Sequence, residues 1–394
     1  MFRDDERTRV IEEVGGLARL GSLAAELASE SGGERVMLVS DPGVAAAGHA
    51  DRAAGVMRAA GLEVALHVDV AENPSSDDVA KAAAAAQAFG PELYVAVGGG
   101  SAIDTAKGAN FVEVCGGRME DYRGHDTATA PLRPLIAVPT TAGTGSEVQS
   151  FALVGDGETG AKMACGDPSA APRVALLDPE LTMTMPRRVT AMTGLDTLAH
   201  AVESAVARPR DPSTDGRSRV YGGAAFGLVS AGLPCVLEAP EDVDARARMM
   251  RASALAGLAI EHAMLGVAHS MANPLTRHHG VPHGLAVGVT LPHVVRFNAA
   301  DDSVEGDMIR RTYAELASAA GLAGEGDRGL AEALAGRCAE LLALADLGTT
   351  LGALGVTSAD LPALALEANE QWTARFNPRG VDAAAFEALL GAAL

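Results

Sequence analysis

The sequence predicts two domains: an α/β N-terminal domain with a parallel sheet over residues 1–184, and an all-α C-terminal domain over residues 185–394. The chain has 394 residues, which is enough for two separate cores. In its first half, short β-rich runs alternate with Ala-rich helical stretches, a pattern typical of a parallel, doubly wound sheet. Beyond residues 181–186, long Ala/Leu segments at helical period replace the strands.

The individual elements follow from apolar runs and the turns that bound them. Each predicted strand is rich in Val, Leu or Ile and leads into a turn or a Gly-rich loop. The predicted strands are residues 36–39, 61–68, 93–97 and 135–138. The predicted helices are residues 77–89 and 102–110 in the first half, and residues 190–207, 245–266, 312–320 and 329–346 in the second.

Charge and composition exclude several classes of partner. The 31 basic and 51 acidic side chains give a formal net charge of -20. Such a surface repels phosphate backbones and anionic membranes, so we expect neither nucleic acid nor membrane as a partner. The charged start of the chain, residues 1–9, lacks the apolar run of a signal peptide, so we expect a cytoplasmic protein.

The cysteines limit the kind of metal site that the chain can build. Its four cysteines are scattered and form no CxxC pair, so we expect reduced thiols. Any metal site must therefore use histidines and carboxylates.

A glycine-rich turn follows the third predicted strand. The residues Gly98-Gly99-Gly100-Ser101 open a helix, and backbone N–H groups at a helix start favour an anion such as a pyrophosphate. The alternative is a plain tight turn, since the segment is not the GxGxxG fingerprint.

A second loop of small residues follows the fourth predicted strand. It runs from Pro139 to Glu147 as PTTAGTGSE, and two such loops converge at the carboxyl edge of a parallel sheet, where ligands bind. Asp41 ends the first predicted strand, where a carboxylate can hold an adenosine ribose and favours NAD over NADP. Its alternative role is an Asx-turn with Pro42 and Gly43.

A candidate metal constellation lies in the second half. Asp196 and His200 are four residues apart, which on a helix places both side chains on one face. A dense histidine cluster follows, including His269 and His283. An aspartate with three imidazoles suits Fe²⁺ or Zn²⁺ and leaves a position open for a substrate oxygen.

These motifs together resemble the iron-containing (group III) alcohol dehydrogenase family, which has the dehydroquinate synthase-like fold. The resemblance implies an NAD-binding N-terminal domain, a metal- and substrate-binding C-terminal domain, a divalent metal (Fe²⁺, with Zn²⁺ as the alternative) and a homodimer. The implied metal ligands are Asp196, His200, His269 and His283. The implied cofactor contacts are Asp41, Asn73, Gly98, Gly99, Gly100, Ser101, Asp104, Thr140, Thr141, Thr144 and Lys162.

One position departs from the family pattern. Many members carry a second histidine four residues after the third ligand, and this histidine is thought to relay the alcohol proton. Asn273 stands there in this chain, and an amide does not titrate near neutral pH. His279 is a candidate replacement, as is His278, and water is the alternative.

The family resemblance predicts hydride transfer between NAD(H) and a small alcohol or aldehyde. Arg277, Arg375, Arg379 and Trp372 lie in segments that can line a pocket, which extends the prediction to substrates that carry an anionic group. Two alternatives remain: another enzyme of the same fold, such as a cyclase or a polyol or glycerol-phosphate enzyme, and a non-catalytic nucleotide-binding protein.

Overall fold

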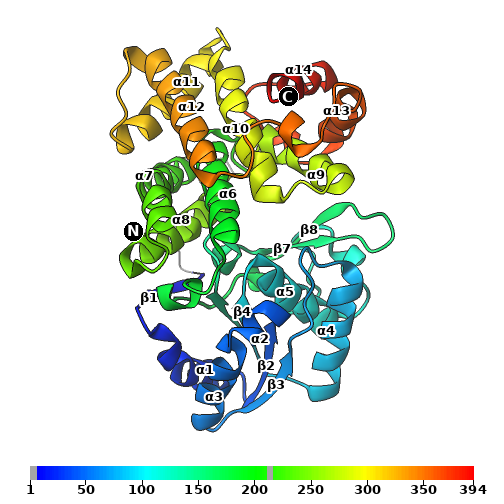
Figure 1. The fold of residues 1–394 in the computed structure, drawn as a ribbon. Helices are drawn as coiled ribbons and strands as arrows, with labels where there is room; N and C mark the ends of the chain where they lie inside the picture. The colour runs from blue at the N-terminus through cyan, green and yellow to red at the C-terminus, as the bar shows by residue number, and fades with distance from the viewer. Residues whose placement is uncertain (1–6, 211–215) are drawn as a thin grey trace. The chain divides into compact units, whose positions relative to one another are not determined.

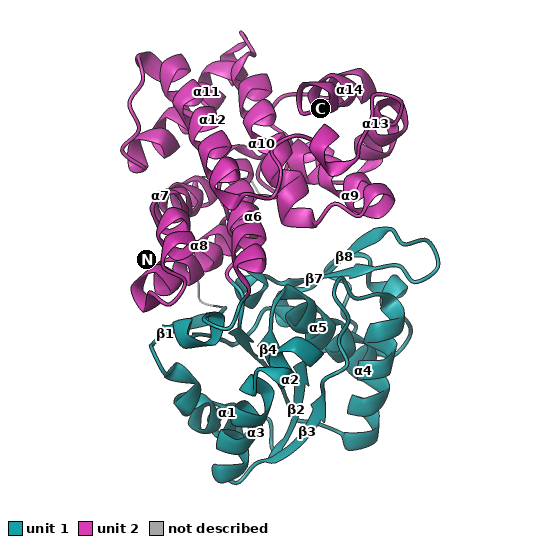
Figure 2. Cartoon of the chain, in the orientation of Figure 1, with its two compact units in different colours: residues 1–141, 145–185 teal, residues 142–144, 186–394 magenta. Residues whose placement is uncertain are grey.

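A computed structural model describes residues 7–210 and 216–394 (Figure 1). Most of the charged start of the chain, residues 1–6, therefore lies outside the described residues. The chain forms two compact units (Figure 2). Unit 1 comprises Met1–Thr141 and Gly145–Met185, and unit 2 comprises Ala142–Thr144 and Pro186–Leu394.

Unit 1 is built on a six-stranded parallel sheet with the order β1-β9-β6-β4-β2-β3. Its strands are β1 (Arg9–Glu12), β2 (Arg35–Ser40), β3 (Glu63–His67), β4 (Leu93–Gly98), β6 (Leu135–Pro139) and β9 (Val174–Leu177). The four predicted strands coincide with β2, β3, β4 and β6. Every residue of β4 and β6 is buried, because a parallel sheet is covered on both faces.

Helices cover both faces of this sheet. They are α1 (Leu20–Glu30), α2 (Pro42–Ala46), α3 (His49–Ala59), α4 (Ser76–Phe89) and α5 (Gly100–Cys115). Val36 and Leu38 of β2 share a core with α1 and α3, whereas Met37 and Val39 share a core with α4 and α5. The alternation follows from the two-residue period of a strand.

Several elements of unit 1 were not predicted, namely the helices α1, α2 and α3, the strands β1 and β9, and a second sheet. The edge strand β1 pairs with β9, and a separate three-stranded sheet has the order β5-β8-β7. Its strands are β5 (Gly124–His125), β7 (Phe151–Gly155) and β8 (Lys162–Gly166). These strands have two to five residues.

Unit 2 is helical, as predicted. Its helices are α6 (Arg187–Val206), α7 (Arg217–Glu238), α8 (Val243–His262), α9 (Val267–His279), α10 (His283–Ala299), α11 (Val304–Ala319), α12 (Gly326–Ala345), α13 (Leu361–Glu370) and α14 (Ala383–Ala392). By length and hydropathy α7 alone among the described helices could cross a membrane, but it packs against α6 and α8 in the core of the unit.

Short 3-10 helices complete the two units. They span Gly16–Arg19, Met119–Tyr122, Ser146–Val148, Pro168–Ala170, Pro179–Thr182, Gly352–Leu354 and Ala374–Phe376.

The contact between α6 and α10 is unusually close. A Cβ atom added to Gly284 would lie 2.1 Å from the Met192 carbonyl oxygen, and one added to Gly288 would lie 3.0 Å from Leu195. Glycines at these points let the two helix backbones approach each other, which brings the start of α10 to the middle of α6.

Candidate metal centre and cofactor loops

The helix α6 supplies the first two predicted metal ligands. Asp196 and His200 lie one turn apart, and they are only 7% and 5% exposed. Ala, Leu and Val residues surround them along the helix, and the helix is buried over most of its length. A buried carboxylate is unfavourable unless a positive charge or hydrogen-bond donors compensate for the lost hydration.

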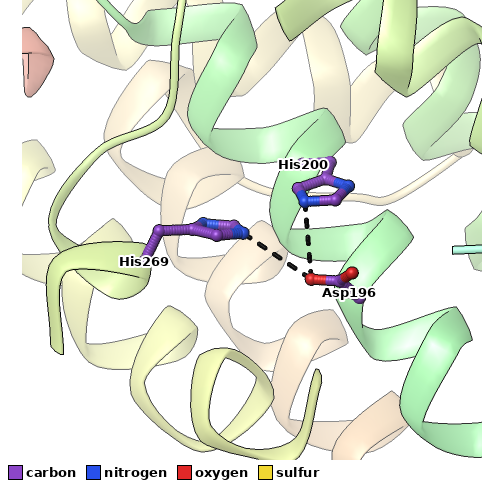
Figure 3. Close-up of side chains that lie close together, drawn as sticks. All are labelled: Asp196, His200 and His269. Atoms are coloured by element: carbon purple, nitrogen blue, oxygen red, sulfur yellow. Dashed lines mark ion pairs between the residues drawn. The ribbon is translucent and has the colours of Figure 1, made fainter. Parts of the chain in front are cut away.

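Three imidazoles face one oxygen of this carboxylate. The Nε2 atoms of His200, His269 and His283 lie 3.4, 3.6 and 3.7 Å from Oδ1 of Asp196. Figure 3 shows Asp196 with the first two of these histidines. His269 comes from α9 and His283 is the first residue of α10, so three helices converge here. The structure therefore brings all four predicted ligands together.

Hydrogen bonds at Nδ1 of His200 and His269 determine which ring nitrogen faces Asp196. Nδ1 of His200 lies 3.1 Å from the Gly143 carbonyl oxygen, and Nδ1 of His269 lies 2.6 Å from Oε2 of Glu203. Since a carbonyl and a carboxylate accept hydrogen bonds, each Nδ1 is the donor. When such a ring is neutral, it presents an Nε2 lone pair to the centre.

The charges of the cluster shift its pKa values strongly. Burial alone would raise the pKa of Asp196, but the imidazoles, His200 foremost, hold it well below its ordinary value. Burial lowers the pKa of His200. Burial also opposes the charged form of His269, but the neighbouring carboxylates of Asp196 and Glu203 raise its pKa to about 9.

The residues fit a divalent cation. Within residues 7–210 and 216–394, Oδ1 of Asp196 and Nε2 of His269 are buried and have no hydrogen-bond partner. The ligand atoms of Asp196, His200 and His269 all lie within 4.8 Å of one another. Buried polar atoms in proteins are nearly always satisfied, so the convergence of these atoms fits a bound cation. Nitrogen and carboxylate donors suit Fe²⁺ and Zn²⁺ alike.

His283 is the most exposed of the four ligands, with 35% of its side chain accessible. Its ring lies 5.3 Å from that of His269, whereas His269 and His200 stack at 4.9 Å. Within unit 2, His283 therefore forms the solvent-facing part of the cluster of four ligands.

In unit 1, the predicted phosphate loop at residues 98–101 leads into α5. Among the described residues, the N-cap of α5 makes no side-chain hydrogen bond to the start of the helix. Gly99 is the N-cap of α5, and Gly100 is its first residue. A Cβ atom on Gly98 would lie 2.5 Å from that of Ala102, and one on Gly99 would lie 3.2 Å from the Thr141 side chain. The backbone is thus packed too closely for side chains, and the N-terminal N–H groups of α5 suit a phosphate.

The other predicted cofactor residues of unit 1 surround this loop. The N–H of buried Thr140 donates to the Gly98 carbonyl oxygen. Oδ1 of Asp41 caps α2 by accepting from the Val44 N–H, while its Oδ2 is 3.1 Å from a Cβ position on Gly98. Asp41 therefore caps α2 with one carboxylate oxygen and directs the other toward the glycine-rich loop.

Asn73 has a left-handed backbone conformation, with φ of 54°, and its N–H donates to Ser101 Oγ at 3.4 Å. Non-glycine residues adopt this conformation infrequently, and asparagine is enriched among them. The contact places the Glu-Asn-Pro-Ser segment beside the start of α5.

Asp104 and Lys107 lie behind the loop. Both are buried, and Oδ2 of Asp104 accepts from the Leu153 N–H of β7. The Lys107 ammonium donates to the carbonyl oxygens of Ser146, Gln149 and Phe151. This pair anchors the end of the second small-residue loop and the segment that follows it. The contact of Asp104 with the cofactor stays a prediction.

Two carboxyl groups behind the loops, those of Asp104 and Glu147, have pKa values raised by burial. Burial raises the pKa of Asp104, against the opposing charges of Lys107 and Lys162. Lys162 is the first residue of β8, and its charge acts on this carboxylate. Burial raises the pKa of Glu147, the last residue of the second loop, to about 7.

Three remaining positions lie in unit 2. Thr144 belongs to the segment Ala142–Thr144, whose Gly143 binds His200. Nδ2 of Asn273 donates to Oε1 of Gln371 at 2.9 Å. His279 is the last residue of α9, near Asp360, whose pKa is lowered by hydrogen bonds from Thr357 and further by this histidine. The structure thus does not place His279 with the ligand cluster.

Sequence reasoning missed Glu203 as part of the site. It is 3% exposed and accepts hydrogen bonds from His269 and from two backbone N–H groups. It lies seven residues after Asp196 on α6, and this spacing returns to the same face of a helix. The helical period could have revealed it.

Taken separately, the two units have the features of a metal-dependent dehydrogenase: a parallel sheet with an open phosphate-binding helix start, and a buried histidine-carboxylate cluster. The comparisons agree. Residues 7–179 match the family model "Iron-containing alcohol dehydrogenase", and residues 190–394 match "Fe-containing alcohol dehydrogenase family, C-terminal". The chain belongs to the iron-containing alcohol dehydrogenase family, and it is a metal-dependent alcohol dehydrogenase that uses NAD.

Named relatives cover nearly the whole chain. The NAD-dependent methanol dehydrogenase of Bacillus methanolicus is 33% identical over 354 residues, covering 88% of this chain and 89% of its own. The 1,3-propanediol dehydrogenase of Klebsiella pneumoniae is 34% identical over 366 residues, covering 91% of each chain. A solved 1,3-propanediol oxidoreductase superposes with a TM-score of 0.89 at 31% identity, covering 98% of this chain and 97% of its own.

Proposed function

We propose that this enzyme interconverts short, uncharged primary alcohols and their aldehydes with NAD⁺/NADH, using Fe²⁺ or Zn²⁺ held by Asp196, His200, His269 and His283. The overall reaction is alcohol plus NAD⁺ to aldehyde, NADH and a proton. One observation carries the proposal, namely the three Nε2 atoms that face a single unsatisfied oxygen of Asp196.

The chain's own groups prepare this chemistry. His200 and His269 are held with Nδ1 donating away from the centre, which leaves Nε2 directed toward Asp196. The carboxylate of Asp196 supplies one negative charge to the site. When bound, a divalent metal supplies Lewis acidity toward the oxygen of the alcohol or aldehyde.

The cofactor loops favour NAD over NADP. The N–H groups at the start of α5 suit the pyrophosphate, since in the part of the chain that the structure describes no side chain caps them. Oδ2 of Asp41 lies beside Gly98, where a carboxylate accepts from a ribose hydroxyl and repels a 2′-phosphate.

The arginines considered for an anionic substrate have other partners. Arg277 pairs with Glu367 at 3.2 Å, and Arg379 lies over the Phe297 ring. Arg375 is exposed and lies over the Phe376 ring.

An apolar cluster lies in the same segments. Ile260, Met264 and Leu265 pack with Trp372 and Phe376. Leu265 directly precedes Gly266, whose N–H donates to the carboxylate that also holds His269. An apolar cluster next to the segment that holds His269 supports an uncharged substrate.

Asn273 cannot relay the proton that the alcohol releases on oxidation. Its amide is tied to Gln371, and it cannot accept and release a proton near neutral pH. We propose that the proton reaches solvent through water, and that His279, beside Asp360, takes no part.

A substrate panel read by NADH absorbance tests the proposal. Metal-depleted enzyme is supplied with iron or zinc separately and assayed with 1-propanol, 1,3-propanediol and a hydroxy acid of similar length. We expect turnover that requires metal and is at least tenfold more efficient with the uncharged alcohols. Equal efficiency with the hydroxy acid would remove the case for an uncharged pocket, and product formation without net NADH would favour a cyclase.

We also propose a cytoplasmic homodimer. The four cysteines are free, which suits a reducing compartment, and the dimer rests on the family resemblance. Light scattering after size-exclusion chromatography should give twice the 40.0 kDa chain mass. A monomer mass would contradict the dimer.

A further inference from the structure

A buried carboxylate that is not itself a ligand lies directly behind the metal centre. Glu203 is 3% exposed, and its Oε2 accepts from Nδ1 of His269 at 2.6 Å. This distance is shorter than the 3.1 Å between Nδ1 of His200 and the Gly143 carbonyl oxygen. Charge-assisted hydrogen bonds of this length are about twice as strong as neutral ones.

The same carboxylate also holds the backbone that carries His269. Oε2 accepts from the Gly266 N–H at 3.1 Å, and Oε1 accepts from the Ala268 N–H at 2.7 Å. These groups lie at the start of α9, where a negative charge is favourable to the helix dipole. Glu203 of α6 thus caps α9 from a different helix.

Gly266 is required for this approach. A Cβ atom at this residue would lie 2.9 Å from Oε1 of Glu203 and 2.9 Å from Oδ1 of Asn377. A side chain there would push the carboxylate away from the start of α9.

We propose that Glu203 is a positioning residue of the metal centre: it holds His269 with Nδ1 as the donor and Nε2 directed at the cation, and so increases the affinity for the metal. This inference rests on the proposed metal site. A hydrogen bond to the outer nitrogen of a histidine ligand fixes its tautomer and ring orientation, and its loss typically lowers metal affinity 10–100-fold.

The variant Glu203→Gln tests the acceptor requirement. All three groups that face Glu203 are donors, so a glutamine must direct its NH₂ group at one of them in either orientation. If the NH₂ faces His269, the ring must accept at Nδ1 and place its proton on Nε2, where the cation binds. Glu203→Asp keeps the charge and both oxygens but shortens the side chain.

The measurement is competition for Zn²⁺ between metal-depleted enzyme and a chelator of known affinity. We expect one zinc per wild-type chain, an affinity about 10–100-fold lower in Glu203→Gln, and an intermediate value in Glu203→Asp. The matched control is Glu261→Gln, which alters another buried carboxylate of unit 2, one paired with Arg210. Its zinc affinity should stay within about threefold of wild type.

A double-mutant cycle with His269→Ala separates positioning from a general loss of structure. If Glu203 acts through His269, then Glu203→Gln should lower zinc affinity less than about threefold in the His269→Ala background. A full 10–100-fold loss in that background, or none in the wild-type background, would overturn the inference. Thermal unfolding of each metal-free variant reports folding, and Glu203→Asp serves if Glu203→Gln does not fold.

The spectrum of Co²⁺-substituted enzyme gives a second readout. Glu203→Asp should shift the visible bands of cobalt because His269 is held differently, whereas Glu261→Gln should leave them unchanged. Failure of the wild type to bind any zinc would instead overturn the proposed function, which distinguishes the two failures.

Discussion

Each unit of this enzyme buries a small group of ionisable side chains, and the two groups differ in how they are satisfied. In unit 1, the Lys107 ammonium donates to three carbonyl oxygens and lies 3.9 Å from Asp104. In unit 2, three imidazole nitrogens lie 3.4 to 3.7 Å from Oδ1 of Asp196, which accepts no hydrogen bond from the described residues.

The comparison teaches that burial of charge does not by itself identify a reactive site. A buried cation enclosed by carbonyl oxygens holds a loop in place, and its donors are all in use. Several potential ligands directed at one unsatisfied oxygen leave room for a cation instead. Four predictions follow from this difference, in decreasing order of expected effect.

Asp196→Ala should have the largest effect. Removal of the carboxylate takes away the charge and the oxygen that three imidazoles face, so we expect loss of bound metal and at least a thousandfold loss of activity, equivalent to about 4 kcal/mol. Metal analysis and NADH absorbance measure the two losses. A variant without metal that keeps normal turnover would contradict the assignment.

Lys107→Met should reduce stability while sparing the metal site. Three carbonyl oxygens lose their donor and Asp104 loses its nearest cation, so we expect the free energy of unfolding to fall by about 3 kcal/mol. The folded variant should still bind one metal ion per chain. Lys81→Met, at an exposed pair with Asp78, should change the unfolding free energy by less than about 0.5 kcal/mol. Equal effects of both variants in denaturant titrations would refute the anchoring role.

Glu147 should impose a pH dependence on stability. Burial raises its pKa from 4.5 to about 7, so between these values the folded enzyme holds a proton that the unfolded chain has lost. Its contribution to stability therefore falls by about 3 kcal/mol in total as pH rises from about 4.5 to 7, and it is level above that range. Relative to Glu147→Gln, the wild type should lose stability across this window in denaturant titrations, and parallel curves would contradict the prediction.

Gly98→Ala should weaken the cofactor without changing the metal. The added Cβ would lie 2.5 Å from that of Ala102, so the loop must shift, and we expect the KM for NAD⁺ to rise about tenfold, equivalent to about 1.4 kcal/mol. Gly55→Ala is the control, since a Cβ there meets nothing within 4 Å. Unchanged cofactor kinetics in Gly98→Ala would argue against this loop as the phosphate site.

The sequence predicted the parts of the fold and site that depend on a single element, through an apolar run or a helical spacing. The buried strands β2, β4 and β6 and the Asp196–His200 pair follow from spacing along one element. His269 and His283 required the family resemblance, because other helices carry them. The sequence did not show that Asp104 is buried and accepts a hydrogen bond from the Leu153 N–H, because this contact joins two elements.

Contacts between elements were beyond the reach of the sequence. The edge strand β1 depends on its partner β9. The helical period can place Glu203 on the face of α6 that carries Asp196, but its hydrogen bonds to the start of α9 depend on packing. The predicted role of His279 depended on where the end of α9 lies, and it lies near Asp360. Such placements follow from packing, which no local pattern in the sequence encodes.

Anomalous X-ray diffraction from crystals grown with Fe²⁺ or Zn²⁺ tests the central claim most directly. We predict a single strong peak per chain, about 2.0–2.2 Å from a carboxylate oxygen of Asp196 and from Nε2 of His200, His269 and His283. A peak bound to other side chains, or no peak with those four side chains directed apart, would contradict it.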